Sequence, residues 1–185
     1  IKGAQHFVKG ENYVVVCNHN SLMDVPVSTP FMPRANKTIA KVSFSKVPVF
    51  GWVYKFGSVL VDRRSDQSRR QSYEEMKAIL AVGLDMIIYP EGTRNRTGDP
   101  LKSFYDGAFR LAVDTQKRII PTILFNSKNI LPPNPSFCLM PGKIEMHFLP
   151  PVNVEGKTSK EVKEEVFELM WNYYAKNQQL LEGRI

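Results

Sequence analysis

Two hydrophobic patterns alternate along the chain. One consists of short apolar runs, and the other of longer stretches in which apolar residues recur roughly once per helical turn. An apolar run of about four to eight residues is typical of a buried β-strand. Runs of this kind predict strands at residues 13–17, 37–41, 58–61, 86–89, 119–125 and 143–149.

The helical periodicity is clearest in two segments. Residues 66–82 predict a helix that ends at Gly83. Its apolar face carries Tyr73, Met76, Ile79 and Leu80. A last helix is predicted from about residue 159, with Thr158 and Glu161 as its capping box. The apolar stripe of this helix is formed by Val162, Val166, Leu169, Met170 and Tyr173.

Shorter helical patterns lie between the strands. Ser21 is a suitable N-cap for a short helix after the first strand. Residues 43–56 predict a largely apolar helix that is broken near Pro48, and residues 107–114 predict another. Residues 126–141, rich in proline and asparagine, predict a loop.

Strands that alternate with helices predict an α/β fold, in which a largely parallel or mixed central sheet is flanked by helices. With 185 residues, of which 43% are hydrophobic, the chain is long enough for one domain with a full-sized core. We therefore expect a single layered domain over residues 1–185.

Charge and cysteine content narrow the class of protein. The net charge of +7 and isoelectric point of 9.4 favour an anionic partner: nucleic acid, a phosphorylated ligand or an acidic membrane face. Cys17 and Cys138 have no paired spacing, which excludes a disulfide framework and a cysteine-rich metal site. No apolar stretch is long enough for a transmembrane helix. Because the chain starts at Ile1, a membrane-anchoring segment before it stays open.

Charged residues follow each of the first four predicted strands. These are, in strand order, Asn18-His19 with Asp24, then Lys41, then Asp62-Arg63-Arg64, and then Glu91-Gly92-Thr93-Arg94. Ligands of open α/β sheets bind outside the carboxyl ends of the strands. The sequence therefore predicts a site at this edge, and its converging cations indicate a phosphate ligand.

His19 and Asp24 have a spacing that suits acid–base chemistry. A carboxylate on one imidazole nitrogen fixes the tautomer, so that the other nitrogen can accept a proton from a hydroxyl. Alternatively, Asp24 only occupies the first turn of a helix, where the helix dipole favours a carboxylate. The pair alone leaves both interpretations open.

Residues 89–98, YPEGTRNRTG, form a turn directly after the fourth predicted strand. Pro90 and Gly92 favour a tight turn, and Glu91 and Arg94 flank a small hydroxyl residue. A surface turn with solvated charges is the simpler interpretation, but the position at a strand end favours a site.

These motifs resemble the signature blocks of the glycerolipid acyltransferases, whose best-known members are the 1-acylglycerol-3-phosphate acyltransferases. Asn18 to Asp24 matches N-H-x-x-x-x-D, and EGTR at 91–94 matches the third block. GSVLVDRR at 57–64 resembles the second block, with Leu60 and Val61 in place of its usual phenylalanine and isoleucine. IIPTIL at 119–124 resembles the fourth block, and AKVSFSKVPVFGW at 40–52 the segment between the first two.

The resemblance implies a glycerol-3-phosphate acyltransferase-like fold. It also implies transfer of a fatty acyl group from acyl-CoA or acyl carrier protein to the sn-2 hydroxyl of lysophosphatidic acid, giving phosphatidic acid; another lysolipid acceptor stays open. His19 would be the base and Asp24 its orienting partner. Acceptor binding, chiefly of the phosphate, is associated with Arg63, Glu91, Gly92, Thr93 and Arg94, and Lys41 is a further phosphate candidate.

The chemistry we expect is direct attack of the hydroxyl on the thioester, without a covalent intermediate. Backbone N–H groups near the start of the helix after His19 are candidate oxyanion donors. Ser21 is better explained as a helix cap than as a nucleophile, and Cys17 as a buried, inert thiol. We expect no metal ion, and no cofactor beyond the thioester co-substrate.

An aromatic segment follows the second predicted strand, with two interpretations. Its apolar residues are Phe44, Val47, Val49, Phe50, Trp52, Val53 and Tyr54, and its basic neighbours are Lys41, Lys46 and Lys55. It is either a core helix, or an apolar surface that meets a bilayer or lines an acyl groove. We expect action at a membrane surface, on its cytoplasmic face. His6 and His147 have no acidic partner at a useful spacing and are predicted to be structural.

Two other classes of protein compete with an acyltransferase. A nucleic-acid binder is suggested by the charge, but the cations stand beside acids at strand ends and form no stripe, so we expect no nucleic-acid partner. A phosphate-ester hydrolase would usually need a metal-binding group of histidines and acids, and the sequence shows no such cluster.

Overall fold

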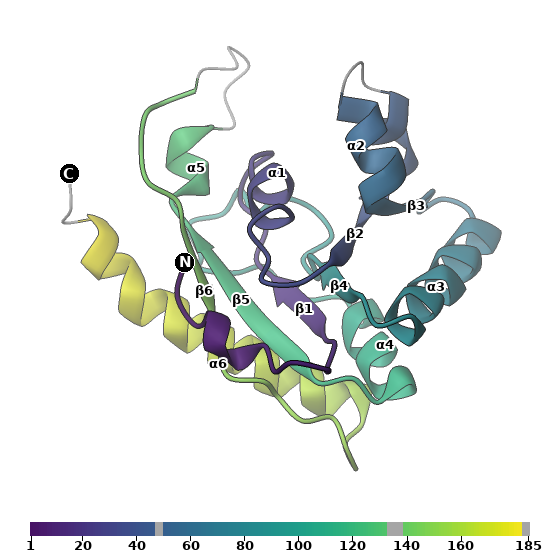
Figure 1. Cartoon of the computed structure of the whole chain (residues 1–185). Coiled ribbons are helices and arrows are strands. Elements are labelled where there is room, and N and C mark those ends of the chain that lie inside the picture. Colours follow the sequence, from purple (N-terminus) through teal and green to yellow (C-terminus); the bar gives the residue numbers. More distant parts are fainter. Residues whose placement is uncertain (47–49, 133–138, 183–185) are drawn as a thin grey trace.

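Six strands form one mixed sheet in the computed structural model, which describes residues 1–46, 50–132 and 139–182 (Figure 1). The strand order is β3-β2-β4-β1-β5-β6, and all neighbours are parallel except β5 and β6, which are antiparallel. The strands are β1 (Val14–Cys17), β2 (Asn36–Lys41), β3 (Ser58–Val61), β4 (Asp85–Ile88), β5 (Ile119–Phe125) and β6 (Glu145–Phe148). The predicted α/β class with a largely parallel or mixed sheet is confirmed.

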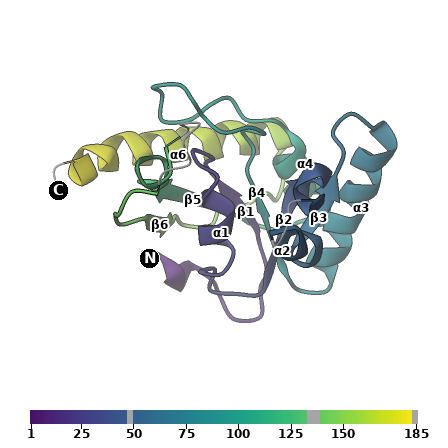
Figure 2. The same ribbon diagram turned by 90° about the horizontal axis from the view of Figure 1, so that it is seen from above.

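The central strand β1 is completely buried because layers cover both faces of the sheet. On one face lie α3 (Asp66–Ala81), α4 (Gly107–Thr115) and α6 (Ser159–Glu182), and they pack on a core that includes Val14 and Val16 (Figures 1 and 2). On the other face, the N-terminal segment and α1 (Asp24–Ser28) cover Val15 and Cys17. A continuous apolar run is what a strand covered on both faces requires.

Both long helices begin where the sequence predicts, and α3 also ends there. Ser65 caps α3, and Gly83, with φ of 88°, lies just beyond its end. At the start of α6, Thr158 donates its backbone N–H to Glu161 Oε2 over 2.7 Å, which confirms the capping box. None of the described helices combines the length and apolar character needed to cross a membrane.

Two local predictions are corrected. The short helix α5 (Ser127–Ile130) interrupts the predicted loop 126–141. The short helix α1 has Met23, not Ser21, at its N-cap position. Ser21 lies before the N-cap position, and its hydroxyl donates to the carbonyl of Leu131 at 3.1 Å, which ties the segment before α1 to the end of α5.

The aromatic segment divides into a 3-10 helix, η2 (Val42–Lys46), and α2 (Phe50–Gly57). The predicted break near Pro48, together with Val47 and Val49, lies outside the described residues, as does Cys138. The side chains of Lys46, Phe50 and Val53 also lie outside them. A further 3-10 helix, η1 (Ala4–His6), was not predicted.

Candidate active site

The strand ends meet as predicted. The parallel strands β1, β2, β3 and β4 point their carboxyl ends to the same edge of the sheet, beside α1 and α2 (Figure 1). The register fixes the level of these ends, because Val16 pairs with Ile88 on β4 and Cys17 pairs with Thr122 on β5. His19 and Glu91 therefore leave the sheet side by side.

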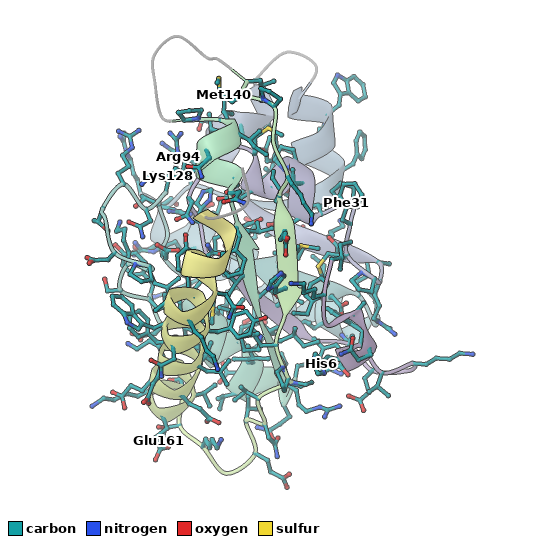
Figure 3. All side chains as sticks on the ribbon, turned by 90° about the vertical axis from the view of Figure 1, so that its left-hand side faces the viewer. His6, Phe31, Arg94, Lys128, Met140 and Glu161 are labelled. Atoms are coloured by element: carbon teal, nitrogen blue, oxygen red, sulfur yellow. The ribbon has the colours of Figure 1, made fainter. Side chains whose placement is uncertain are left out.

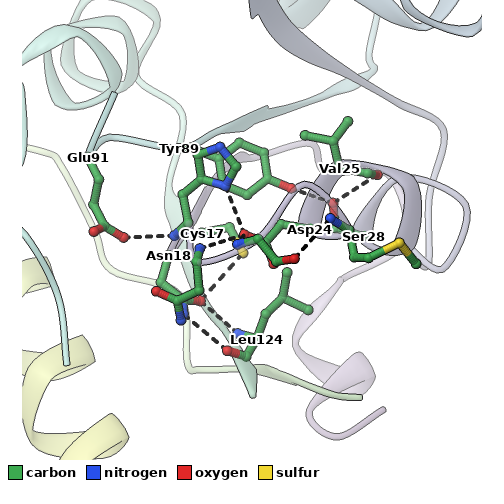
Figure 4. Close-up of polar contacts among 12 residues, drawn as sticks. Cys17, Asn18, Asp24, Val25, Ser28, Tyr89, Glu91 and Leu124 are labelled. Carbon is green, nitrogen blue, oxygen red and sulfur yellow. Dashed lines mark hydrogen bonds and ion pairs between the residues drawn. The ribbon is translucent and has the colours of Figure 1, made fainter. Parts of the chain in front are cut away.

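His19 and Asp24 form a pair. Nδ1 of His19 lies 2.8 Å from Oδ2 of Asp24, whose side chain is fully buried. The backbone N–H groups of Asn20 and Ser21 donate to the same oxygen, over 2.6 and 2.8 Å (Figure 4). A carboxylate fixed at this place can hold a hydrogen on Nδ1. Within the described residues Nε2 has no hydrogen bond, so it is left to accept a proton.

The backbone hydrogen bonds also narrow the set of candidate oxyanion donors. The N–H groups of Asn20 and Ser21 are already engaged by Asp24, and that of Met23 donates to the Ser21 hydroxyl at 3.3 Å. Between residues 20 and 24, Leu22 has the one N–H group without a hydrogen bond in the described part of the chain. The side chain of Leu22 lines the pocket beside His19.

Asn18, the first residue of the N-H motif, fixes the backbone that precedes His19. Its side-chain amide donates to the carbonyl of Leu124 at 3.0 Å, and its Oδ1 accepts the N–H of Leu124 at 2.7 Å (Figure 4). Asn18 thus ties the end of β1 to β5 through two hydrogen bonds in a fully buried place. It orients the backbone from which His19 projects.

Glu91 clamps two backbone segments. Its Oε1 accepts the N–H of His19 at 2.7 Å, and its Oε2 accepts the N–H of Lys102 at 3.0 Å. The residue is 1% exposed, and burial raises the pKa of its carboxyl, while the two backbone hydrogen bonds lower it. Both oxygens are thus engaged inside the protein, so the side chain supports the turn instead of reaching into the pocket.

The turn after β4 is fastened to the base a second time. Asn95 donates its backbone N–H to the carbonyl of His19 at 2.6 Å, and its side-chain amide donates to the carbonyl of Asp99 at 2.9 Å. Asn95 is 3% exposed. Sequence reasoning missed this residue, because an asparagine in a charged turn gives no signal of burial.

Arg63 and Gly92 join the loops that follow β3 and β4. A guanidinium nitrogen of Arg63 donates to the carbonyl oxygen of Gly92. Gly92 has φ of 69°, and a Cβ there would collide with the ring of Tyr105. Glycine adopts this conformation without strain, which explains why it stands between Glu91 and Thr93.

A pocket of about 720 Å³ opens at His19. Its cationic lining comes from β2 and from the loops after β3 and β4: Lys41, Arg63, Arg64, Arg94, Arg96 and Lys102. Its apolar lining comes from α1 and the residues just before it, from β2, η2 and α2, and from the segment after β4: Leu22, Val25, Ile39, Ala40, Phe44, Tyr54 and Tyr89. The pocket thus offers one lining for an anion and another for a hydrocarbon chain.

Lys102 and Arg96 were missed by sequence reasoning. Arg96 lies in the predicted turn 89–98 but was not named as a site residue, and Lys102 lies beyond that turn. The ammonium group of Lys102 donates a hydrogen bond to the hydroxyl of Thr93 at 2.7 Å. Lys102 therefore lies within reach of an anion bound at that turn. A run of alternating basic residues in a turn is a signal that could have identified Arg96.

Tyr89 forms the wall behind the base. Its ring centroid lies 4.8 Å from that of His19, and its hydroxyl lies 2.6 Å from Oγ of Ser28 on α1. Burial raises the pKa of Tyr89 well above its ordinary value. The imidazole is therefore held by Asp24 at its edge and by an aromatic ring at its face.

The two residues considered as nucleophiles are unsuited to that role. Cys17 is fully buried in β1, and burial raises the pKa of its thiol well above the ordinary value, so the predicted inert thiol is confirmed. Ser21 uses its hydroxyl in the bond to Leu131.

The prediction for His147 was partly wrong. Nε2 of His147 lies 2.8 Å from Oε2 of Glu145, an acidic partner on the same strand, β6. Residues two apart in a strand point to the same face, so this pair was readable from the sequence. The pair packs against Tyr173 of α6, away from the site.

The fold and site together define an α/β protein with a histidine–aspartate pair beside a cationic pocket. A model of the Acyltransferase family matches residues 1–124, and the chain belongs to this family. Within the described residues, no cluster of three or more histidine, cysteine or acidic side chains is placed to hold a metal ion.

Relatives carry more specific names. The mouse 1-acyl-sn-glycerol-3-phosphate acyltransferase alpha is 32% identical over 88% of this chain and 57% of its own length. The coconut 1-acyl-sn-glycerol-3-phosphate acyltransferase is 28% identical over 80% of this chain and 48% of its own. The chain thus spans about half the length of these curated relatives.

A solved structure matches the whole chain. The 1-acyl-sn-glycerophosphate acyltransferase PlsC from Thermotoga maritima superimposes with a TM-score of 0.79 and 27% sequence identity, over 100% of this chain and 72% of its own. The fold implied by the sequence motifs is therefore confirmed.

Proposed function

We propose that this protein transfers a fatty acyl group from an acyl thioester to the sn-2 hydroxyl of 1-acylglycerol-3-phosphate and releases phosphatidic acid. The observation that carries the proposal is the 2.8 Å contact between His19 Nδ1 and Asp24 Oδ2, with Nε2 left to act at a pocket that has both cationic and apolar linings. The names of the relatives support the same reaction.

In the proposed reaction, Nε2 of His19 removes the proton of the acceptor hydroxyl while its oxygen attacks the thioester carbonyl. The new C–O bond gives a tetrahedral oxyanion, which collapses and breaks the C–S bond. The leaving thiolate takes up a proton from the His19 imidazolium. General-base catalysis of this kind contributes about 10²–10⁴-fold to the rate.

The cationic lining is assigned to the acceptor phosphate. Arg63, Arg94 and Lys41 come from three different strand ends, and Lys102 with Thr93 completes the set. Glu91 and Gly92 shape the turn that presents these groups. The apolar lining, with Leu22 and Tyr54, is assigned to hydrocarbon. The N–H of Leu22 is the proposed oxyanion donor, because its neighbours are engaged by Asp24 and Ser21.

The proposal includes both donors, acyl-CoA and acyl carrier protein, and no further cofactor. It also includes action at a membrane surface, because both the acceptor and the product are lipids, and we propose the cytoplasmic side for that surface. No nucleic-acid partner is proposed, since the cations converge on a pocket and do not form an extended stripe.

The test is an assay with lysophosphatidic acid in lipid vesicles and either donor. Release of free thiol is followed together with phosphatidic acid by mass spectrometry. We expect turnover with at least one donor and its loss in His19→Ala. A panel of other lysolipids identifies a different acceptor, while failure with both donors and every acceptor contradicts the proposal.

A further inference from the structure

Large apolar side chains remain exposed at the end of the molecule that carries the pocket. Trp52 and Phe56 on α2 are 70% and 65% exposed, and Leu139 and Met140, beyond α5, are 56% and 50% exposed. Figure 1 shows α2 and α5 on the same end as α1, past the carboxyl ends of the strands. We call these four residues the apolar tip.

The exposure of α2 is not a sign of loose packing. A Cβ at Gly51 would collide with the backbone carbonyl of Ser45, so α2 lies directly against η2. The inward side chain, Tyr54, lines the pocket with its ring centroid 5.2 Å from that of Phe44. Trp52 and Phe56 point away from that contact.

Trp52 and Phe56 form one surface. They stand one helical turn apart, and their ring centroids lie 5.9 Å from each other. Neither belongs to the pocket lining. An exposed pair of large aromatic residues at this spacing is typical of an interfacial helix, whose apolar face enters the boundary between lipid headgroups and acyl chains.

Basic residues surround the apolar tip. Lys55 is the one charged residue of α2, and it is exposed, as are Lys41 at the end of β2 and Lys128 on α5. Figure 3 shows Met140 at the extremity, with Lys128 and Arg94 set back from it and Glu161 at the opposite end. If this end of the molecule faced a bilayer, the apolar residues would enter first and the cations would lie at the depth of the phosphate headgroups.

This arrangement favours an anionic bilayer over a protein partner. The apolar residues come from two segments separated in sequence and lie at the same end of the molecule. Leu22, which is 38% exposed, adds an apolar side chain to the pocket lining. The net charge of +7 complements an anionic surface. If the proposed function holds, the acceptor and the product are themselves anionic lipids of such a surface.

We propose that the apolar tip inserts into the interfacial region of an anionic bilayer, so that the pocket opens onto the lipid. The inference rests on the proposed function for the lipid that enters the pocket, but the binding surface itself does not. Lipids would then reach His19 from the bilayer without crossing water.

The test uses Trp52 as its own probe, because the chain contains only two tryptophans. In a Trp171→Phe variant, fluorescence reports on Trp52 alone. With vesicles of phosphatidylcholine and phosphatidylglycerol, we expect a blue shift and quenching by brominated lipids. With phosphatidylcholine alone, or at high salt, we expect a weaker response.

A double variant, Trp52→Ala with Phe56→Ala, should lower the vesicle partition coefficient about tenfold. Val82→Ala, which removes a side chain 72% exposed at the far end of α3, is the matched control and should leave it unchanged. Circular dichroism of each variant establishes that it is folded. Equal partitioning of the double variant and the unaltered chain would overturn the proposal.

A second activity measurement separates this inference from the proposed function. The double variant should retain turnover on a short-chain, water-soluble lysophosphatidic acid and lose it on vesicle-bound acceptor. If Trp52 inserts into vesicles but no acyl transfer is detected, the proposed function is refuted and the membrane-binding surface is supported. A blue shift that grows with protein concentration in the absence of lipid would assign the surface to a second copy and refute the membrane proposal.

Discussion

The backbone N–H of His19 donates to the carboxylate of Glu91 over 2.7 Å, so the base and the EGTR turn form one mechanical unit. The second carboxylate oxygen holds the N–H of Lys102. A single buried side chain thus sets the distance between the base and the cations of the pocket.

Replacing Glu91 should therefore damage the site without touching a substrate. Glu91→Gln keeps one carbonyl oxygen but places an NH₂ group against a backbone N–H, so we expect kcat to fall about tenfold. In Glu91→Ala, kcat should fall further, and the free energy of unfolding should drop by about 2 kcal/mol. Steady-state kinetics and urea unfolding measure the two effects. If kcat is unchanged in both variants, the clamp has no role in catalysis.

Asp24 is expected to act through the tautomer of His19. Asp24→Asn offers an amide whose NH₂ group would face Nδ1 or the two backbone N–H groups, so kcat should fall about 10²–10⁴-fold with little change in KM. Asp66→Asn is a matched control, because Asp66 also lies in the first turn of a helix but is exposed. Equal rates in the two variants would show that Asp24 only decorates its helix.

Lys102 is expected to bind the acceptor phosphate from beside Thr93. Lys102→Met keeps the length of the side chain and removes its charge, so KM for the acceptor should rise about tenfold while kcat changes little. Lys77→Met, on the outer side of α3, controls for net charge. Initial rates over a series of acceptor concentrations measure the difference. A lowered kcat at unchanged KM would instead give Lys102 a part in the chemical step.

Asp85 carries a pH dependence of stability that is independent of the site. Burial raises the pKa of this carboxyl from 3.8 to about 6, although the N–H of Tyr13 and the charge of Arg34 lower it. Because the folded pKa exceeds the unfolded one, ionisation costs the folded state about 3 kcal/mol at pH 7. The cost disappears as the pH falls from about 6 to about 4.

Asp85→Asn should remove this dependence. The amide oxygen still accepts the N–H of Tyr13, so the variant should be more stable than the unaltered chain at pH 7 and lose that advantage near pH 4. Chemical unfolding across this range, with both proteins side by side, measures the difference. A constant difference at all pH values would mean that Asp85 ionises normally in the folded protein.

The central strands were predictable because burial on both faces requires uninterrupted apolar runs, and 13–17 and 119–125 have little else. The long helices were predictable because apolar residues recur about once per turn along them. The meeting of His19, Arg63 and Glu91 followed from parallel order alone. The contacts that finish the site were not predictable. Whether Ser21 caps a helix or binds Leu131 depends on α5, which lies far along the chain.

Roles of the same residue types differed for the same reason. Glu91 and Lys102 look alike in a sequence as charged turn residues, yet one is buried with both oxygens engaged and the other faces the pocket. Tyr89 and Asn95 gave no chemical signal, since packing against His19 is a property of three dimensions. His147 was within reach of strand geometry, because Glu145 stands two residues before it.

Gly92 divides the cationic turn into positions that can vary and one that cannot. Its backbone conformation and the nearby ring of Tyr105 disfavour any side chain, and its carbonyl accepts a hydrogen bond from Arg63. Arg94, Arg96 and Lys102 are free of that restriction and extend into the pocket from the same loop. A laboratory that wished to redirect this protein to a different lipid headgroup would therefore diversify those three positions and leave the glycine as the fixed frame.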